Sequence, residues 1–325
     1  MSASFRRIAA CLSLALGALG PAHAQSPAAS SGRPLRIVVP YASGGLADIT
    51  ARLLSEHLAA RLHQPVVVEN KPGANGAIGT AQVAKAAPDG NTLVYVVSSH
   101  VFGRALIPDL PFDPIKDFAP VTLATRTAMV LVASPSLPVN NVPELVAYVR
   151  ARPNQLAFAS AGNGSNVHVF GQWFADLAGL KMTHVPYKGS AAAHMDLIAG
   201  RTQIVFDTLG AVQPHVAAGN LKILAAGAER LPKYPDIPTV AEAGYPGFRA
   251  ESWGAVLAPA GTPAARIDQL NREIVAALNL PEVRKRLEDA GAQVVGSTPA
   301  ELGQTLVAEE KKYGDLIRRM GIRLE

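Results

Sequence analysis

Two short glycine-rich segments carry the residue types best suited to holding a ligand. Residues 40–48 read PYASGGLAD, and residues 160–168 read SAGNGSNVH; each lies between an apolar run and a helical pattern. Paired glycines let the backbone approach a ligand closely, and the start of a helix presents unpaired N–H groups with a partial positive charge. Both segments are therefore expected to favour an anion, with positive φ at Gly44 and Gly45. The same residues also fit plain turns of a doubly wound sheet, where glycines are common.

Motifs of well-known enzyme classes are incomplete or missing. The second segment lacks the third glycine of a dinucleotide fingerprint, residues 73–80 lack the lysine of a phosphate-binding loop, and no G-x-S-x-G elbow occurs. The eight histidines form no H-E-x-x-H pattern and have no cysteine partner, which argues against a metal site. Asp48 and Asp207 are better explained as capping or turn carboxylates than as an acid/base pair. The sequence predicts binding without catalysis and without a cofactor.

The N-terminal residues have the order of a cleavable secretory signal. Arg6 and Arg7 precede an apolar run of about 12 residues, shorter than the roughly 20 needed to span a bilayer. The triplet at residues 22–24, Ala-His-Ala, offers a cleavage site, so we expect a signal peptide at 1–24 and a flexible tail at 25–32 in a periplasmic protein. A lipoprotein anchored at Cys11 is the competing interpretation, although only about three apolar residues would precede that cysteine.

Length and composition indicate how the mature protein is organised and which classes of partner it is not expected to bind. Cleavage would leave about 300 residues, which favours two lobes over a single core. The sole cysteine, Cys11, would be removed, so no disulfide is expected. Loss of Arg6 and Arg7 lowers the formal net charge from +5 to +3, and no basic run of the kind that binds nucleic acid is present. We therefore expect a soluble monomer with no nucleic-acid partner.

Strand and helix patterns alternate along the chain, which is typical of an α/β protein with parallel strands. Apolar runs typical of strands occur at residues 35–39, 66–68, 92–97, 129–133, 156–159, 204–206, 221–225 and 253–257, and the run at 66–68 is predicted to be buried. Helical patterns occur at residues 49–62, 78–86, 142–151, 170–174, 267–278 and 281–290, with a last helix after a capping box at 298–301. The strand at 253–257 is expected to lead back into the first lobe.

The order of several motifs resembles the tripartite tricarboxylate transporter substrate-binding family, the Bug-type receptors. The resemblance runs from about residue 34 to the C-terminus and rests on residues 39–48, 68–79, 87–92, 160–168, 185–189, 196–200 and 258–263. It implies a two-lobed type II periplasmic binding protein fold, in which each lobe is a mixed sheet flanked by helices and the ligand lies in the interlobe cleft. Lobe one would comprise residues 33–127 and 253–325, and lobe two residues 128–252.

The resemblance also implies a set of ligand-binding residues drawn from both lobes. These are Tyr41, Ser43, Gly44, Gly45, Asp48, Ser98 and Ser99 in lobe one, and Ala161, Asn163, Gly164, Ser165, His168, Tyr187, Lys188 and Asp207 in lobe two. The chain departs from the family pattern at Leu46, usually a small residue, and at Ala192, where proline is frequent. Both departures bear on the size and shape of the pocket.

The expected function is capture of a small organic carboxylate and its delivery to the subunits of a membrane transporter. A periplasmic co-sensor that presents the same ligand to a signalling partner would need the same cleft. An enzyme acting on an organic acid is the other alternative, which the missing catalytic motifs disfavour.

Overall fold

The computed structural model describes residues 33–324, so the predicted signal peptide and tail lie outside the described residues. Within this range ten strands form one sheet. Its order is β2 (Val66–Asn70), β1 (Leu35–Val39), β3 (Thr92–Val97), β9 (Glu251–Pro259), β4 (Phe118–Ala133), β7 (Ile204–Thr208), β5 (Ala157–Ser160) and β6 (Thr183–Pro186), while β8 (Lys222–Ala226) and β10 (Ala292–Val294) each pair with β4. The sheet is mixed: β1 pairs in parallel with β2 and β3, whereas β9 is antiparallel to β3 and β4.

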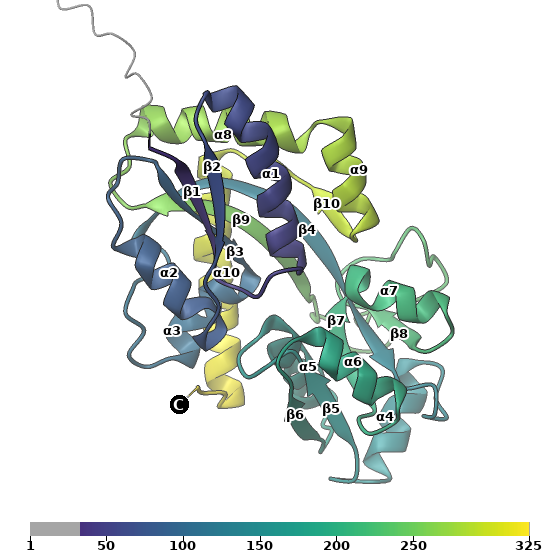
Figure 1. The fold of residues 1–325 in the computed structure, drawn as a ribbon. Helices are drawn as coiled ribbons and strands as arrows, with labels where there is room; N and C mark the ends of the chain where they lie inside the picture. The colour runs from purple at the N-terminus through teal and green to yellow at the C-terminus, as the bar shows by residue number, and fades with distance from the viewer. Residues whose placement is uncertain (1–32, 325) are drawn as a thin grey trace, which may run out of the picture. The chain divides into compact units, whose positions relative to one another are not determined.

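The long strand β4 joins the two halves of the sheet (Figure 1). Its residues 118–128 pair with β9, and from Met129 onward it pairs with β7 and β8. The register shifts between Pro120 and Thr122 and again between Leu123 and Thr125. Such bulges bend a strand and increase its twist, which lets one strand serve two differently oriented halves.

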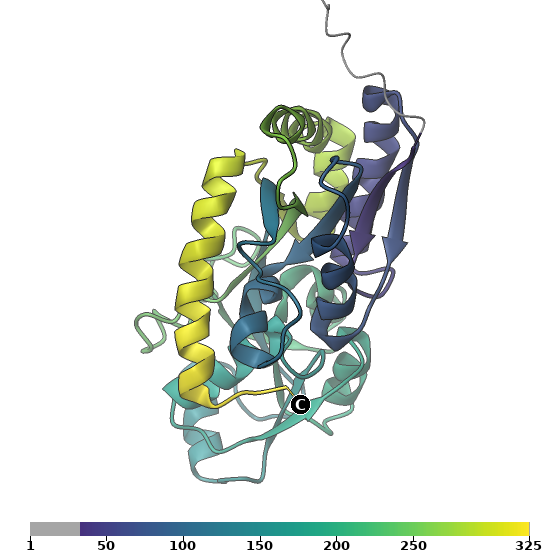
Figure 2. The ribbon, with the colours of Figure 1, turned by 90° about the vertical axis from the view of Figure 1, so that its left-hand side faces the viewer.

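Helices cover both faces of the half that contains β1 and β3. Leu35, Ile37 and Val39 pack into a core with α1 (Leu46–Leu62), α8 (Ala264–Leu278) and α9 (Pro281–Asp289). Val38, from the opposite face of β1, packs with α2 (Ala77–Ala84) and α10 (Pro299–Met320), and Figure 2 shows α10 and α1 on opposite sides of the sheet. This alternation along one strand is the period of two that places successive side chains on opposite faces.

The other half is built from β4 to β8 and its own helices. These are α4 (Val142–Arg150), α5 (Asn166–Leu177), α6 (Ser190–Ile198) and α7 (Leu209–Ala217); the short elements η1 (Ala74–Gly76), η2 (Ser98–Phe102) and α3 (Gly103–Leu106) belong to the first half. Phe170, Trp173 and Phe174 of α5 are all buried, as their shared helical face predicts. None of the helices within residues 33–324 combines the length and apolar character that a membrane span needs.

Two sequence expectations about strands need correction. The run at 66–68 is a strand, but the prediction that it is buried is wrong: β2 is an edge strand, and Val67 is 43% exposed because only β1 lies beside it. The apolar run at 129–133 is only the end of β4, whose first part begins at Phe118 in a proline-containing stretch. The capping box at Thr298 and Glu301, by contrast, is confirmed at the start of α10.

Candidate functional site

A cavity of about 710 Å³ lies where the loops of both halves meet. Its lining includes the first glycine-rich segment, the second glycine-rich segment and residues of the crossing strands β4 and β9. Of the residues implied by the family resemblance, the lining contains Tyr41, Ser43, Gly44, Gly45, Ser99, Ala161, Ser165, Lys188 and Asp207. The volume lies within the range of about 300–1,000 Å³ that is usual for small-molecule sites.

Within the part of the chain that the structure describes, four helices begin at this cavity. Residues in the first turn of α1, α5, α6 and α7 contribute to its lining. The N-cap residues of α1, α6 and α7, which are Gly45, Gly189 and Thr208, make no side-chain capping hydrogen bond. Unpaired N–H groups and the positive end of the helix dipole therefore face the cavity from both halves of the sheet, an arrangement that stabilises a negative charge. The sequence predicts two of these four helix starts, those of α1 and α5, and the second is capped by Ser165.

The two glycines of the first segment play different roles. Gly44 adopts φ +85°, as expected, but the expectation of positive φ at Gly45 is wrong: its φ is −79° and its backbone is extended. This is the ordinary conformation of an N-cap residue. A side chain at position 45 would meet nothing closer than the carbonyl oxygen of Ala42, at 4.0 Å.

Asp48 does not line the cavity, and its carboxylate holds the backbone of the first glycine-rich segment by a hydrogen bond. Its Oδ2 accepts a hydrogen bond from the Gly44 N–H at 2.9 Å, and Arg52 Nε donates to its Oδ1 at 3.0 Å. Burial alone would raise the pKa of Asp48, but the hydrogen bonds from Arg52 and Gly44 outweigh it and lower the pKa. The ionised carboxylate is therefore committed to holding the loop.

His168 has the same supporting role in the second segment. Its Nδ1 accepts a hydrogen bond from the Gly164 N–H at 3.1 Å, and its ring stacks on that of His184 with centroids 3.7 Å apart. Burial, with a smaller contribution from the neighbouring ring, lowers the pKa of His168 to about 3, and burial lowers that of His184 to about 4. A neutral ring is what an accepting Nδ1 requires. Ser165 caps α5 by accepting from the N–H of His168 at 3.2 Å.

Lys188 and Asp207 are the charged side chains in the described lining of the cavity. Asp207 is buried, and both of its oxygens are engaged: Oδ2 lies 2.9 Å from His194 Nε2, and Oδ1 accepts from the Thr208 N–H at 2.7 Å. Lys188 lies beside the start of α6 and is exposed. Among the described lining residues, an anion entering the cavity therefore meets the exposed Lys188 and a carboxylate that already has partners.

Several residues implied by the resemblance lie outside the main lining. Tyr187 donates its hydroxyl to Asp196 at 2.7 Å, and burial followed by this bond raises the pKa of Tyr187 to about 12. Asn163 lines a neighbouring hollow, and Gly164 packs close to the side chain of Leu324. Ser98 is buried, with its Oγ 3.1 Å from that of Ser252.

Other lining residues were not singled out from the sequence because they lie inside strands or helices. Tyr95 has its hydroxyl 3.1 Å from Thr125 Oγ1, and Asn166 Nδ2 donates to Ser252 Oγ at 2.9 Å. The absence of a side chain at Gly254 leaves space for Tyr95, since a Cβ there would lie 2.1 Å from the tyrosine hydroxyl. Strand alternation from Ser252 to Gly254 is the signal that places both on the cavity side.

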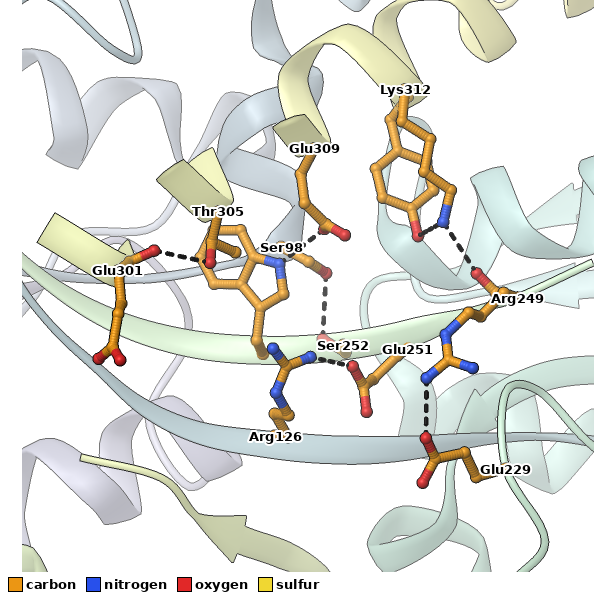
Figure 3. A network of polar contacts seen from close by, with 12 residues as sticks. Ser98, Arg126, Glu229, Arg249, Glu251, Ser252, Glu301, Thr305, Glu309 and Lys312 are labelled. Carbon is orange, nitrogen blue, oxygen red and sulfur yellow. Dashed lines mark hydrogen bonds and ion pairs between the residues drawn. The ribbon is translucent and has the colours of Figure 1, made fainter. Parts of the chain in front are cut away.

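Polar side chains of β4, β9 and α10 lie close together in Figure 3. Arg126 of β4 forms an ion pair with Glu251 of β9, and the Trp253 indole N–H donates to Glu309 of α10 at 2.8 Å. Burial raises the pKa of Glu309, and its bond from Trp253 counteracts this only in part. The ion pair therefore connects β4 to β9, and the bond from Trp253 connects β9 to α10, so α10 supports the strands that form one wall of the cavity.

The geometry suits reversible binding of an anion. Within residues 33–324 no group of three or more histidine, cysteine, aspartate or glutamate side chains is placed to hold a metal ion. The described lining combines backbone donors, hydroxyls and aromatic rings with Lys188 and the already paired Asp207, which suits a site that orients a small polar ligand with an apolar body.

Comparisons with known proteins agree with this geometry. A family model described as a tripartite tricarboxylate transporter family receptor matches residues 50–322. Protein BugT of Bordetella pertussis is 36% identical over 322 residues, covering 98% of this chain and 99% of BugT. Two solved structures from Rhodopseudomonas palustris are similar: one with adipate (TM-score 0.82, 34% identity, 90% of this chain and 99% of that one) and MatC with bound malate (TM-score 0.80, 36% identity, 88% and 99%).

Proposed function

The chain belongs to the tripartite tricarboxylate transporter receptor family, and on this premise we propose that it captures a small organic carboxylate and delivers it to a membrane transporter. The observation that carries the proposal is the meeting of three uncapped helix starts and Lys188 at one cavity. Each places positive charge or N–H donors where a carboxylate would sit. The proposal includes export to the periplasm by a signal peptide cleaved after Ala24, and action as a monomer.

The energetics of this site are sufficient for a transport receptor. A micromolar dissociation constant corresponds to about −8.2 kcal/mol. Charge-assisted hydrogen bonds contribute about 1.5–3 kcal/mol each before the cost of ordering the ligand. A few donors from the starts of α1, α6 and α7 therefore account for such an affinity without an arginine in the described lining.

We place the ligand between two lobes that close on it. In this proposal lobe one comprises residues 33–127 and 253–325, and lobe two residues 128–252, with β4 and β9 as the crossing segments. The change of strand partners within β4, between Ala128 and Met129, supports this division. The cavity of about 710 Å³ is well above the roughly 300 Å³ at the lower end of small-molecule sites, so a small acid leaves room for ordered water beside it.

Adipate and malate, which the two similar structures hold, are the first ligands to test. A thermal-shift screen should compare these acids with monocarboxylates, tricarboxylates and aromatic acids, with uncharged polyols at equal concentration as the control. A ligand at 100 times its dissociation constant adds about 2.7 kcal/mol of stability, which corresponds to about 5 °C for a chain of this length. If no acid raises the midpoint above the polyol control, the proposed function is wrong.

We also propose that the bound acid is released unchanged. Stoichiometric protein incubated with its best ligand should return that ligand intact, as judged by NMR. Recovery of a chemically altered product would instead identify an enzyme.

A further inference from the structure

The turn between β2 and α2 has an unusual backbone. Residues 73–76 all adopt positive φ, with values of +135° at Gly73, +45° at Ala74, +50° at Asn75 and +91° at Gly76. Positive φ is uncommon for residues other than glycine, and two such residues in succession are rarer still. A conformation of this kind persists where surrounding contacts hold it, and it often marks a functional segment.

A side-chain hydrogen bond connects the tip of this turn to the other half of the sheet. Asn75 Nδ2 donates a hydrogen bond to the carbonyl oxygen of Gly164 at 2.8 Å. Gly164 belongs to the second glycine-rich segment, in the loop that precedes α5. Asn75 also borders the main cavity and two neighbouring hollows. The bond therefore spans the rim of the cavity, where the two halves meet.

We propose that Asn75 is a positioning residue whose hydrogen bond to Gly164 latches the two halves over the ligand cavity. The positive φ values point its carboxamide across the rim, and asparagine tolerates this conformation better than most residues do. In an open state both partners would bond to water, so the net gain from the bond is small. Because this bond contributes little free energy by itself, the contacts of a bound ligand can determine whether the cleft is mostly closed or mostly open.

This inference rests on the proposed function only in supposing that the cleft opens and closes. Its test therefore uses the ligand-free protein. Asn75→Gly removes the carboxamide and keeps a residue that favours positive φ, so it adds no backbone strain. Ala74→Gly is the matched control, because Ala74 has the same backbone conformation and lies outside the lining of the main cavity.

Single-molecule FRET between two exposed positions would measure closure. Labels placed by Glu56→Cys on α1 and Asp176→Cys on α5 of the chain that begins at Gln25, which contains no other cysteine, report the distance between the halves. Without ligand, Asn75→Gly should lower the closed-to-open ratio about fivefold, equivalent to about 1 kcal/mol, while Ala74→Gly leaves the ratio unchanged.

Three outcomes would overturn the latch. Identical ligand-free distributions for both variants and the parent would show that the contact does not bias closure. A loss of adipate or malate affinity in Asn75→Gly with an unchanged ligand-free distribution would make Asn75 a ligand contact only. A loss of unfolding stability with an unchanged distribution would make it a structural contact only. Failure of every acid to bind would refute the proposed function and leave the ligand-free measurement interpretable.

Discussion

Gly45→Ser should weaken ligand binding without weakening the fold. Gly45 is the N-cap of α1, has extended backbone geometry (φ −79°, ψ 167°) and has no side-chain cap. Serine is among the best N-cap residues, and its hydroxyl accepts a hydrogen bond from the N–H of the second or third helical residue, here Ala47 or Asp48. The substitution would therefore occupy a donor that now faces the cavity.

The two effects differ in size. Serine and glycine at an N-cap differ by only a few tenths of a kcal/mol in stability. A ligand carboxylate that loses one charge-assisted hydrogen bond loses about 1.5–3 kcal/mol, which is about a 10- to 100-fold weaker dissociation constant. The loss of binding free energy should therefore be several times larger than the change in the free energy of unfolding.

Calorimetric titration with the best acid of the screen, together with urea unfolding, would measure both quantities. Gly45→Ala is the control, because it adds a Cβ in the same open space without a hydrogen-bond acceptor. Parental affinity in a folded Gly45→Ser protein would show that the start of α1 does not hold the ligand. Equal weakening by Gly45→Ala would show that bulk, and not a lost donor, is responsible.

Three further predictions concern stability. Gly164→Val should lower the free energy of unfolding by about 2 kcal/mol or more in urea titrations, because φ is +74° there and a Cβ would lie 2.7 Å from Leu324 Cδ1. Gly254→Ala should also be destabilising, since its Cβ would lie 2.1 Å from the Tyr95 hydroxyl, and Tyr95→Phe should restore part of the loss. Burial lowers the pKa values of the stacked His168 and His184 rings. Below about pH 6.5 the unfolded chain therefore binds protons on these rings that the folded chain does not. Stability should therefore be complete above about pH 6.5 and fall by up to about 1.4 kcal/mol per pH unit for each ring towards pH 4, whereas a flat profile in urea titrations would contradict the described burial.

The glycine-rich loops can be predicted from the sequence because the patterns that mark them lie within a few neighbouring residues. Glycine pairs, a following apolar period and a serine cap predict a loop that opens a helix, and α1 and α5 begin where these signals place them. The starts of α6 and α7 carry no comparable signal. The helix α6 is itself alanine-rich and has weak apolar periodicity, and α7 contains Pro214, so the sequence pattern predicts neither helix.

Residues of the site that lie on strands depend on pairing between distant segments. Tyr95 and Gly254 lie side by side only because β3 and β9 are antiparallel neighbours, which no local pattern indicates. In the same way, Asp48 and His168 carry ordinary ligand-binding chemistry, yet the structure uses both to hold loop backbone. Side-chain type alone does not distinguish a group that faces the ligand from one that supports it.

The cavity is expected to recognise its ligand mainly by the ligand's negative charge. Calorimetric titration with adipate or malate and with the corresponding diamide, which keeps the shape but removes the charge, tests it most directly. We expect micromolar, one-to-one binding of at least one acid and binding of its diamide at least about 100-fold weaker. Equal affinity for the acid and its diamide would show that the cavity does not recognise the negative charge.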